Sequence, residues 1–368
     1  MKIKRVIKWG FLAVVAVLGC WLFVAYWMST NDCEKYAKVP DHPIKAIVYC
    51  EYGPPEVLQL REIEKPTPTA NELLIKVRAA SVNPVDSTYS GGVRLVTGLR
   101  KPKETRFGTD YAGTVEAVGE KVSQFKPGDE VLGGKTGALA EYVCVREDRS
   151  VVLKPANVSF AQAAAVPVAA ITALQGLRDK GKIQSGQKVL VNGASGGVGT
   201  FAVQIAKSFG ADVTAVCSGK NAEMVRSIGA DHVIDYTKED FTAGGERYDM
   251  IFDIVGNHSF SERRRVLKPN GICVMAGLGG SGWHDGFWSR LGGELTSYIA
   301  SRFVKEKFIA YIAEFNKTDM TILRDLMEAG KIKPVIDKTF PFTQVPEAVR
   351  YLETGHARGK VVVTVGEG

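Results

Sequence analysis

The segment of residues 188–207 constrains the fold most strongly, because it predicts a strand, a glycine turn and a helix in immediate succession. A short apolar run is typical of a buried parallel strand, and Gly193, Gly196 and Gly199 follow it at three-residue spacing. Without a Cβ atom, these glycines allow a tight turn, a close approach of the backbone to a phosphate, and close packing of helix on strand. The spacing alone is a weak signal, but the strand before it and the helix expected over residues 198–209 make it specific.

A turn of this kind predicts a site for the pyrophosphate of a dinucleotide. The N–H groups at the start of the helix, and the positive end of its dipole, point toward the anion. The alternative is a glycine turn in a sheet protein that binds nothing. We expect the cofactor to contact six residues of the turn, namely Gly193, Ser195, Gly196, Gly197, Val198 and Gly199.

The residues after the next strand indicate which dinucleotide binds. Residues 212–217 complete a βαβ unit, and an NAD site usually has Asp or Glu at this strand's end, which binds the ribose hydroxyls and would repel a 2′-phosphate. This chain instead has Ser218, Lys220 and Asn221, which can donate hydrogen bonds to a phosphate. The sequence therefore predicts NADPH, the alternative being an ordinary polar surface turn. Tyr236, after the third apolar run, is expected either to contact the adenosine end or to be ordinary packing.

Two further apolar runs, with a helical stretch between them, follow within residues 248–277. Strands and helices thus alternate as in a doubly wound parallel sheet. Ligands of such sheets lie beyond the carboxyl ends of the strands. Val255, Gly256, Gly277 and Leu278 are therefore predicted to lie near the nicotinamide half of the cofactor.

The first residues predict a membrane anchor. Residues 9–31 contain no charged side chain, and about 20 apolar residues suffice to span a bilayer. Trp9 at one end and Tyr26 and Trp27 at the other fit interfacial aromatic belts. Residues 17–20 look like a lipoprotein cleavage site, but the apolar run continues beyond them, which favours an uncleaved transmembrane helix. The basic residues before the span favour an external C-terminal domain, whereas a soluble nicotinamide cofactor favours a cytoplasmic-facing one, which is the side we expect.

Composition argues against a nucleic-acid partner. The net charge of +7 includes four basic residues in the first eight positions, and no basic stripe with interleaved aromatic residues follows. The 368 residues, 45% of them hydrophobic, suit about two globular domains. The cysteines are widely separated, form no CxxC pair and are predicted to be small buried hydrophobic residues. They are Cys20, Cys33, Cys50, Cys144, Cys217 and Cys273.

The sequence on either side of the nucleotide-binding region predicts a second domain. Residues 44–157 contain short β-rich segments separated by Pro and Gly, which is typical of a folded-over β domain. Two helices, near residues 319–329 and 345–353, and a strand at residues 360–365 are expected to return to it. A nucleotide domain inserted between two parts of a β domain would leave a cleft for substrate.

Six motifs follow one another within residues 44–366: ASVNPVD at 80–86, GTDYAGTV at 108–115, KPGDEV at 126–131, AVPVAAITAL at 165–174, the glycine turn, and GADHVIDY at 229–236. In these motifs and their order the chain resembles the medium-chain dehydrogenase/reductase superfamily, and within it the zinc-independent quinone oxidoreductases of the zeta-crystallin-like branch. The resemblance implies an α/β fold in which a Rossmann-type doubly wound parallel sheet is inserted into a GroES-like β-rich catalytic domain. The uncharged run of residues 9–31 adds one transmembrane helix before it. The expected division is an anchor at 1–31, a linker at 32–43, the catalytic domain at 44–167 and 306–368, and the Rossmann domain at 168–305.

The same resemblance implies that the site holds no zinc. Zinc-dependent relatives supply a Cys in the segment matching residues 80–86, a His where Thr109 stands and a second Cys near Val168, and this chain has none of the three. The lobe with four closely spaced cysteines is also missing, and a zinc site needs three or four correctly spaced ligands. Without a Lewis acid, the expected chemistry is the reduction by NADPH of an already activated electrophile, a quinone or an α,β-unsaturated carbonyl.

The resemblance further implies Asn83 and Thr172 as contacts near the nicotinamide and substrate, with Asp86 behind them. A structural turn and helix packing are the alternative roles of Asn83 and Thr172. Lys360 is expected either to reach the cofactor phosphates or to be a solvated lysine. The glycine-rich segment 277–293, which contains three aromatic residues, is expected to form a loop over the cleft, or else to meet the membrane or a subunit partner. A homodimer is expected from the family alone, and the sequence shows no general acid.

Two other functions stay open at this point. One is an alcohol dehydrogenase that acts on small alcohols or aldehydes, for which stoichiometric zinc or strong inhibition by a chelator would be evidence. The other is a non-catalytic NADPH-binding sensor or scaffold, which predicts tight cofactor binding without hydride transfer to any acceptor.

Overall fold

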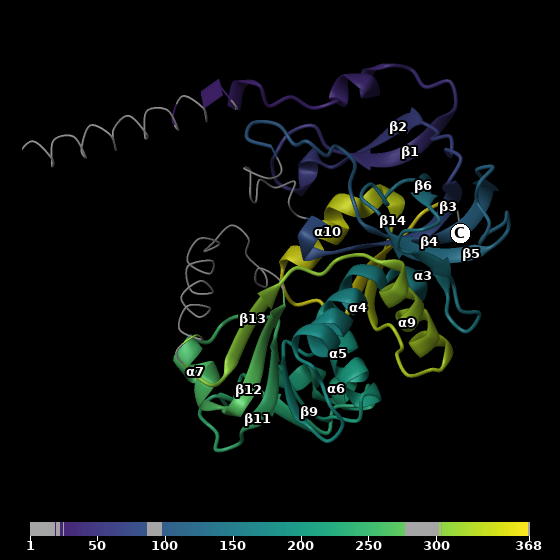
Figure 1. Cartoon of the computed structure of the whole chain (residues 1–368). Helices are drawn as coiled ribbons and strands as arrows, with labels where there is room; N and C mark the ends of the chain where they lie inside the picture. The colour runs from purple at the N-terminus through teal and green to yellow at the C-terminus, as the bar shows by residue number, and fades with distance from the viewer. Residues whose placement is uncertain are drawn as a thin grey trace, which may run out of the picture.

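A six-stranded parallel sheet forms one half of the molecule (Figure 1). The computed structural model describes residues 19, 23–24, 26–86, 98–276, 302 and 304–366. The strand order is β10-β9-β8-β11-β12-β13, so the chain runs outward in one direction from β8 and then crosses to its other side at β11. The strands are β8 (Lys188–Asn192), β9 (Asp212–Cys217), β10 (His232–Asp235), β11 (Tyr248–Asp253), β12 (Leu267–Ala276) and β13 (Lys307–Tyr311). The predicted doubly wound parallel sheet is confirmed.

Helices cover this sheet because their apolar faces complete its core. The main one is α5 (Gly197–Ser208), in which Phe201 and Ile205 are fully buried, and Gly210 ends it with a φ of +79° that favours glycine. The shorter helices α6 (Ala222–Ser227) and α7 (Phe260–Arg265) follow β9 and β11. Helix α4 (Pro167–Leu174) packs against α5 and continues into a π-helical turn, Gln175–Lys180.

A second, mostly antiparallel sheet forms the other half and contains both early and late parts of the chain. Its order is β14-β15-β3-β4-β5-β7, with β6 also paired to β3. The strands are β3 (Glu72–Val82), β4 (Asp110–Val118), β5 (Glu130–Gly134), β6 (Tyr142–Arg146), β7 (Val151–Leu153), β14 (Ile336–Pro341) and β15 (Lys360–Thr364). Because β15 pairs with β3, with Val361 opposite Val82, the expected return of the chain to the β domain is observed.

Smaller elements complete this half. The hairpin of β1 (Pro43–Val48) and β2 (Gln59–Glu64) joins it through bridges from Ala46 to Ala140 and from Val48 to Arg106. The helices α3 (Phe160–Ala164), α9 (Lys317–Glu328) and α10 (Val345–Glu353) lie in the connections between the two sheets or against the second one. The α/β organisation expected from the sequence is thus present in both halves.

The predicted membrane anchor is corrected. Most of residues 9–31 lies outside the described residues; among those that are described, no helix is long and apolar enough to cross a bilayer. An uncharged stretch is necessary for a span, but a continuous helix of about 20 apolar residues is also required. From Ser29 onward the chain instead packs on the β-rich half, where the Ser29 hydroxyl accepts a hydrogen bond from the Arg100 backbone N–H at 3.2 Å. The assignment to a membrane, with a cytoplasmic-facing domain, is withdrawn with it.

The interpretation of the cysteines is wrong at two positions. Cys33 and Cys50 form a disulfide that fastens the short 3-10 helix Cys33–Ala37 to the end of β1. Cys144, Cys217 and Cys273 are free and buried as predicted, and Cys20 lies outside the described residues. The pairing could not be seen in the sequence, because the partners are 17 positions apart and neither belongs to a spacing motif.

Candidate active site

The glycine turn has the geometry that a pyrophosphate site requires. Gly193 has a φ of +89°, and its N–H donates to the Val216 carbonyl oxygen at 3.2 Å. A Cβ atom on Gly199 would lie 2.1 Å from the Gly193 carbonyl oxygen, so the start of α5 can approach the turn only without a side chain. At Gly196, which precedes the helix, a Cβ atom would meet only that same oxygen at 3.6 Å. The N-terminus of α5 thus faces an opening, where its free N–H groups can bind an anion.

Three residues predicted for the adenosine end meet beside this turn. The amide nitrogen of Asn221 donates to the Ser195 hydroxyl at 3.0 Å and to the Ser218 hydroxyl at 3.2 Å. The amide oxygen of Asn221 is buried and has no hydrogen-bond partner among the described residues. A buried acceptor in this condition is costly, and a hydroxyl donor of a bound nucleotide would satisfy it. Lys220 is exposed beside them and its side chain can reach solvent or a ligand.

A carboxylate that sequence reasoning missed lies at the same place. Asp235 ends β10, directly beside the end of β9, and its Oδ2 lies 2.4 Å from where a Cβ atom on Gly219 would stand. The hydrogen bond from the Thr237 hydroxyl, at 2.7 Å, is the main reason that the pKa of Asp235 is below its ordinary value. Lys238 lies 3.6 Å from it. Tyr236 is 58% exposed, so it is not packed in the interior.

The carboxyl ends of β8 and β11 meet at the point where the strand order reverses. A Cβ atom on Gly193 would lie 2.9 Å from Cγ2 of Val255, so the glycine turn contacts the residues after β11. Buried Asp253 fixes this junction, because it accepts hydrogen bonds from the Val255 N–H at 3.1 Å and Asn192 Nδ2 at 2.9 Å, and pairs with Arg263 at 3.2 Å. Gly256 also donates to Asp253, at 2.9 Å.

Two predicted cofactor contacts, Gly277 and Leu278, lie outside the described residues, as does the whole segment 277–293.

Two predicted catalytic residues belong to one buried polar cluster in the second sheet. Asp86 accepts hydrogen bonds from the Asn83 N–H at 2.8 Å and from the Thr109 hydroxyl at 2.7 Å. The amide nitrogen of Asn83 donates to Asp110 at 3.0 Å, and its amide oxygen accepts from the ammonium of Lys360. The ammonium also lies 3.2 Å from Asp110 Oδ2. We call these five residues the buried cluster.

Two more residues, both missed by sequence reasoning, hold Asp110 in place. The Ser81 hydroxyl donates to Oδ2 at 2.7 Å, and the Val168 N–H at the start of α4 donates to Oδ1 at 2.9 Å. The side chain of Asp110 is fully buried, and Ser81 is as well. The buried cluster therefore joins β3, β4, β15 and α4, and the residues that build and hold it come from positions as far apart as 81 and 360.

Burial and charge set the protonation of Asp86. Its burial is the main reason that its pKa is raised to about 6, and the neighbouring charge of Asp110 adds to the rise. The Thr109 hydroxyl, the Asn83 N–H and the Lys360 ammonium act in the opposite direction. The cluster holds two carboxyl groups and one ammonium out of water, so a carboxyl that takes up a proton near neutral pH relieves its uncompensated negative charge.

The side chain of Lys360 extends from the start of α5 into the buried cluster. Its stem passes the start of α5, where a Cβ atom on Gly197 would lie 3.1 Å from Lys360 Cδ, and Gly359 forms a parallel bridge with Gly196. The residue is 3% exposed, so the alternative of a solvated lysine is wrong. Its ammonium points into the buried cluster and binds Asn83 and Asp110.

Thr172 stands apart from the buried cluster. Its hydroxyl donates to the Val168 carbonyl oxygen within α4, at 2.7 Å, and its carbonyl oxygen accepts from the Tyr311 hydroxyl. These bonds pack α4 and join it to β13, and helix packing was the alternative role expected for this residue. Val198, in the first turn of α5, is partly buried against the core.

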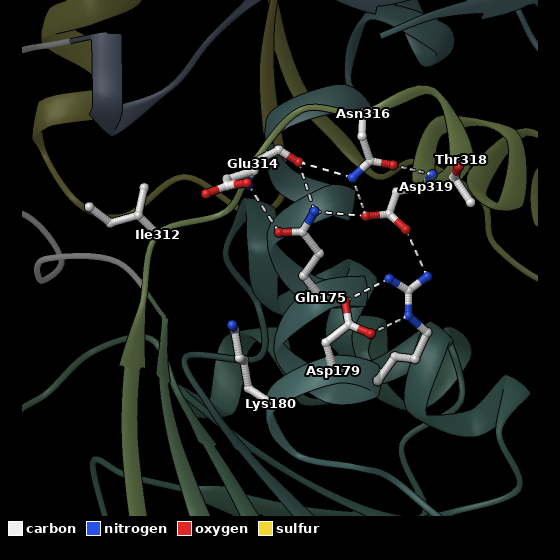
Figure 2. A pocket seen from close by; sticks show the side chains of 9 residues that line it. Gln175, Asp179, Lys180, Ile312, Glu314, Asn316, Thr318 and Asp319 are labelled. Carbon is white, nitrogen blue, oxygen red and sulfur yellow. Dashed lines mark hydrogen bonds and ion pairs between the residues drawn. The ribbon is translucent and has the colours of Figure 1, made fainter. Parts of the chain in front are cut away.

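A separate polar pocket of about 420 Å³ lies where the π-helical turn faces the connection after β13 (Figure 2). Asp319 accepts hydrogen bonds from Gln175 at 2.7 Å and Asn316 at 2.8 Å and pairs with Arg178 at 2.7 Å. Arg178 also pairs with Asp179 at 2.6 Å. These groups satisfy one another, as Figure 2 shows, and none was predicted for the active site. These contacts therefore hold Gln175–Lys180 against the segment that follows β13.

In the part of the chain that the structure describes, no three His, Cys, Asp or Glu side chains are grouped so that they could hold a metal ion. Of the positions that match zinc ligands of zinc-dependent relatives, Thr109 contacts Asp86, and Val168 contacts Asp110, the residue after Thr109. They present a hydroxyl, two carboxyl groups and a backbone amide, a donor set without the thiolate and imidazole groups that zinc prefers.

Comparison with known proteins agrees with this architecture. Residues 69–156 match the model for the alcohol dehydrogenase GroES-like domain, and residues 228–363 match that for zinc-binding dehydrogenases. A 2-methylene-furan-3-one reductase of Solanum lycopersicum is 38% identical over 335 residues, which cover 87% of this chain and 79% of the relative. A chloroplastic NADPH-dependent alkenal/one oxidoreductase of Arabidopsis thaliana is 37% identical, with 89% of this chain and 81% of the relative covered.

A solved structure extends the likeness to three dimensions. The quinone oxidoreductase of Coxiella burnetii superposes with a TM-score of 0.77 at 31% identity, covering 88% of this chain and all of that one. The sequence relatives and the solved structure each cover most of this chain. The chain belongs to the medium-chain dehydrogenase/reductase superfamily, and it is an NAD(P)H-dependent oxidoreductase of the quinone and enone reductase type.

Proposed function

We propose that this oxidoreductase uses NADPH, without zinc, to transfer hydride to a quinone or to the β-carbon of an α,β-unsaturated carbonyl compound. One observation carries the proposal: the Gly196–Gly359 bridge brings the start of α5 directly beside the buried cluster. A dinucleotide bound at the turn would therefore extend toward Asn83 and Asp86. The names of the relatives, which include an alkenal/one oxidoreductase and a quinone oxidoreductase, support this substrate class.

The choice of NADPH over NADH is supported by the group at the end of β9. Ser218 and Lys220 offer a hydroxyl and an ammonium to a 2′-phosphate, and the amide nitrogen of Asn221 holds the Ser218 hydroxyl in place. The carboxylate of Asp235 lies nearby, but it accepts hydrogen bonds from Thr237 and its charge is offset by Lys238. We therefore expect Lys220 to contribute most of the discrimination.

Two groups of residues would bind the cofactor and orient the substrate. The N-terminus of α5 and the turn would bind the pyrophosphate, and NADPH, when bound, supplies the hydride. Asn83 is held rigidly by Asp86, Asp110 and Lys360, so it can orient a ring or carbonyl group that binds beside it.

Thr109 and Asp86 can move a proton. While Asp86 is ionised, the Thr109 hydroxyl donates to it, at 2.7 Å. When Asp86 is protonated it can donate to Thr109 Oγ1 instead, which frees the hydroxyl hydrogen for another acceptor. A carboxyl with a pKa of about 6 exchanges protons readily near neutral pH, so this pair is our candidate for delivering a proton after hydride transfer.

The experiment is to follow NADPH oxidation with a panel of benzoquinones, naphthoquinones, alkenals and cyclic enones, with saturated aldehydes as the control acceptors. We expect turnover with the activated acceptors, slower reaction with NADH, and no loss of activity after treatment with a chelator. NADPH binding without turnover of any acceptor would contradict the proposal and favour a sensor or scaffold. Zinc-dependent oxidation of alcohols with NADP⁺ would favour an alcohol dehydrogenase.

Two further expectations stay proposals. The nucleotide domain, predicted over residues 168–305, is proposed to extend to the end of β13 (Lys307–Tyr311), because that strand is the sixth of the parallel sheet. A homodimer is also expected, and light scattering coupled to gel filtration would test it.

A further inference from the structure

We propose that Lys360 is a positioning residue that couples the cofactor turn to the buried cluster, because one side chain contacts the start of α5 and holds Asn83 and Asp110. This inference deepens the proposed function and rests on it. It replaces a direct contact between Lys360 and the cofactor phosphates with an indirect action through Asn83 and Asp86.

Lys360 lies against the cofactor turn. Lys360 is the first residue of β15, and its N–H donates to the Val335 carbonyl oxygen at 2.8 Å. The preceding Gly359, at a φ of +103°, is bridged to Gly196. A Cβ atom on Gly197 would lie only 3.1 Å from Lys360 Cδ, so the stem lies against the first residue of α5. A change in the turn on cofactor binding therefore reaches Lys360 directly.

The other end of the Lys360 side chain contacts the buried cluster. The ammonium binds the amide oxygen of Asn83 and lies 3.2 Å from Asp110, and all three residues are at most 3% exposed. The opposite end of the Asn83 amide donates to Asp86 at 3.3 Å and to Asp110 at 3.0 Å. Lys360 therefore determines which way the Asn83 amide points, because only an acceptor can face the ammonium.

Lys360 also balances the negative charge of the buried cluster. Asp86 is faced by the carboxyl of Asp110, the ammonium of Lys360 and the phenol of Tyr49. The charge of Asp86 contributes to the raised pKa of Tyr49, after the larger effect of burial. Lys360 is the single cation among these groups. Without it, two buried carboxyl groups would be left near each other, and Asp86 would bind its proton more tightly. The position of Lys360 thus sets both the orientation of Asn83 and the proton affinity of Asp86.

The test compares three variants with the wild-type protein. Lys360→Met removes the cation and keeps most of the stem, Lys360→Arg restores a cation, and Lys338→Met is the control. Lys338 lies on the neighbouring strand β14, is exposed and is not part of the buried cluster. Each variant is assayed for kcat and KM across pH with an enone and NADPH. The carboxyl of Asp86 is titrated by carbon NMR in the cofactor-free protein.

We expect Lys360→Met to raise the Asp86 titration midpoint by about one pH unit or more and to lower kcat about tenfold or more, with a smaller change in the KM for NADPH. Lys360→Arg is expected to restore part of both. If the midpoint and kcat of Lys360→Met match those of Lys338→Met, the inference is overturned. A fall in NADPH affinity alone, with an unchanged midpoint, would instead mean that Lys360 binds the phosphates directly.

Two arms keep the result interpretable. If Lys360→Met does not fold, Gly197→Ala retains the cation and places a methyl group against its stem; the inference then predicts a shifted Asp86 midpoint, and an unshifted one contradicts it. If wild-type protein reduces no quinone or enone, the proposed function fails, whereas the NMR titration of the cofactor-free protein still decides the role of Lys360.

Discussion

Lys360 and Asp110 form a buried ion pair, with 3.2 Å between Nζ and Oδ2, across 250 positions of the sequence. The pair joins β15 to β4, and Asn83 lies between the two charges. Breaking such a pair from one side leaves an unpaired buried charge, which is more damaging than losing a surface ion pair. The pair therefore makes the returning part of the chain necessary for the geometry of the predicted catalytic residues.

Asp86 is expected to give the protein an unusual pH dependence of stability. Because its pKa is raised from 3.8 to about 6, its contribution is fully present below pH 3.8 and is lost as the pH rises through 6. The loss amounts to about 3 kcal/mol. In urea titrations, wild type relative to Asp86→Asn should lose stability between pH 4 and about 7 by roughly this amount. Exposed Asp148→Asn serves as the control, and a difference between wild type and Asp86→Asn that does not vary with pH would contradict the shifted pKa.

Asp319 is expected to behave in the opposite sense. Burial alone would raise its pKa, but hydrogen bonds from Arg178, Gln175 and Asn316 outweigh burial and hold the pKa below 3.8. Its contribution is therefore present above that value and lost as the pH falls through the lower, folded-state pKa. Asp319→Asn should lower the free energy of unfolding by about 1–3 kcal/mol at neutral pH, a modest loss because Arg178 is partly exposed. The loss should be smaller in acid, where Asp319 itself becomes protonated. Exposed Asp325→Asn, on the same helix, should change unfolding little at either pH.

Two alanine substitutions in the glycine turn should separate folding from cofactor binding. Gly199→Ala places a methyl group 2.1 Å from the Gly193 carbonyl oxygen, so we expect a loss of about 2 kcal/mol or more in unfolding free energy. Gly196→Ala has its nearest neighbour at 3.6 Å, so stability should be kept while NADPH affinity falls about tenfold or more, because the methyl group enters the opening before α5. Gly245→Ala, which has open space around it, is the control for both measurements. Equal effects of the first two variants would argue against a pyrophosphate at this turn.

The cofactor preference is expected to depend on Lys220. Lys220→Glu replaces a donor to the 2′-phosphate by a repelling charge, so kcat/KM with NADPH should fall about tenfold or more while that with NADH changes little. Lys121→Glu, an exposed reversal in the β-rich half, is the matched control for net charge. A parallel loss with both cofactors would mean that Lys220 has a structural role.

The disulfide should contribute measurably to stability. A bridge that closes a loop of 17 residues is expected to stabilise the folded state by about 3 kcal/mol through the entropy of the unfolded chain. The double variant Cys33→Ser/Cys50→Ser should unfold at correspondingly lower urea concentration. Dithiothreitol should lower the midpoint of the wild-type protein and leave the variant unchanged; sensitivity of the variant to dithiothreitol would point to another cause.

The local signals in the sequence were sufficient for most elements of the parallel sheet. The strand Asp212–Cys217 and the helix Val345–Glu353 begin and end where the apolar pattern predicts, because burial on the sheet or on one helix face dictates that pattern. The glycine turn could be interpreted because a strand, a turn and a helix are consecutive in the chain. Asn83 and Asp86 could be nominated only through the family's motif, and the structure brings these two together.

What could not be predicted depends on contacts between distant segments. Nothing near Lys360 in the sequence indicates Asp110 as its partner, and Asp235 was overlooked because it ends the neighbouring strand rather than β9 itself. The Cys33–Cys50 pairing has the same character. The anchor was predicted from an uncharged apolar stretch, whereas no helix among the described residues is long and apolar enough to cross a bilayer.

The pairing of β15 with β3 has a consequence for biosynthesis. Strand β3 ends at Val82, but its partner β15 begins only at Lys360, after the entire parallel sheet has been made. At about 5–20 residues per second, tens of seconds pass on the ribosome before the gap beside β3 can be filled. During that interval the edge of β3 at residues 79–82 lacks the strand that covers it in the folded protein, so it is open to pairing with another chain until the last strand emerges.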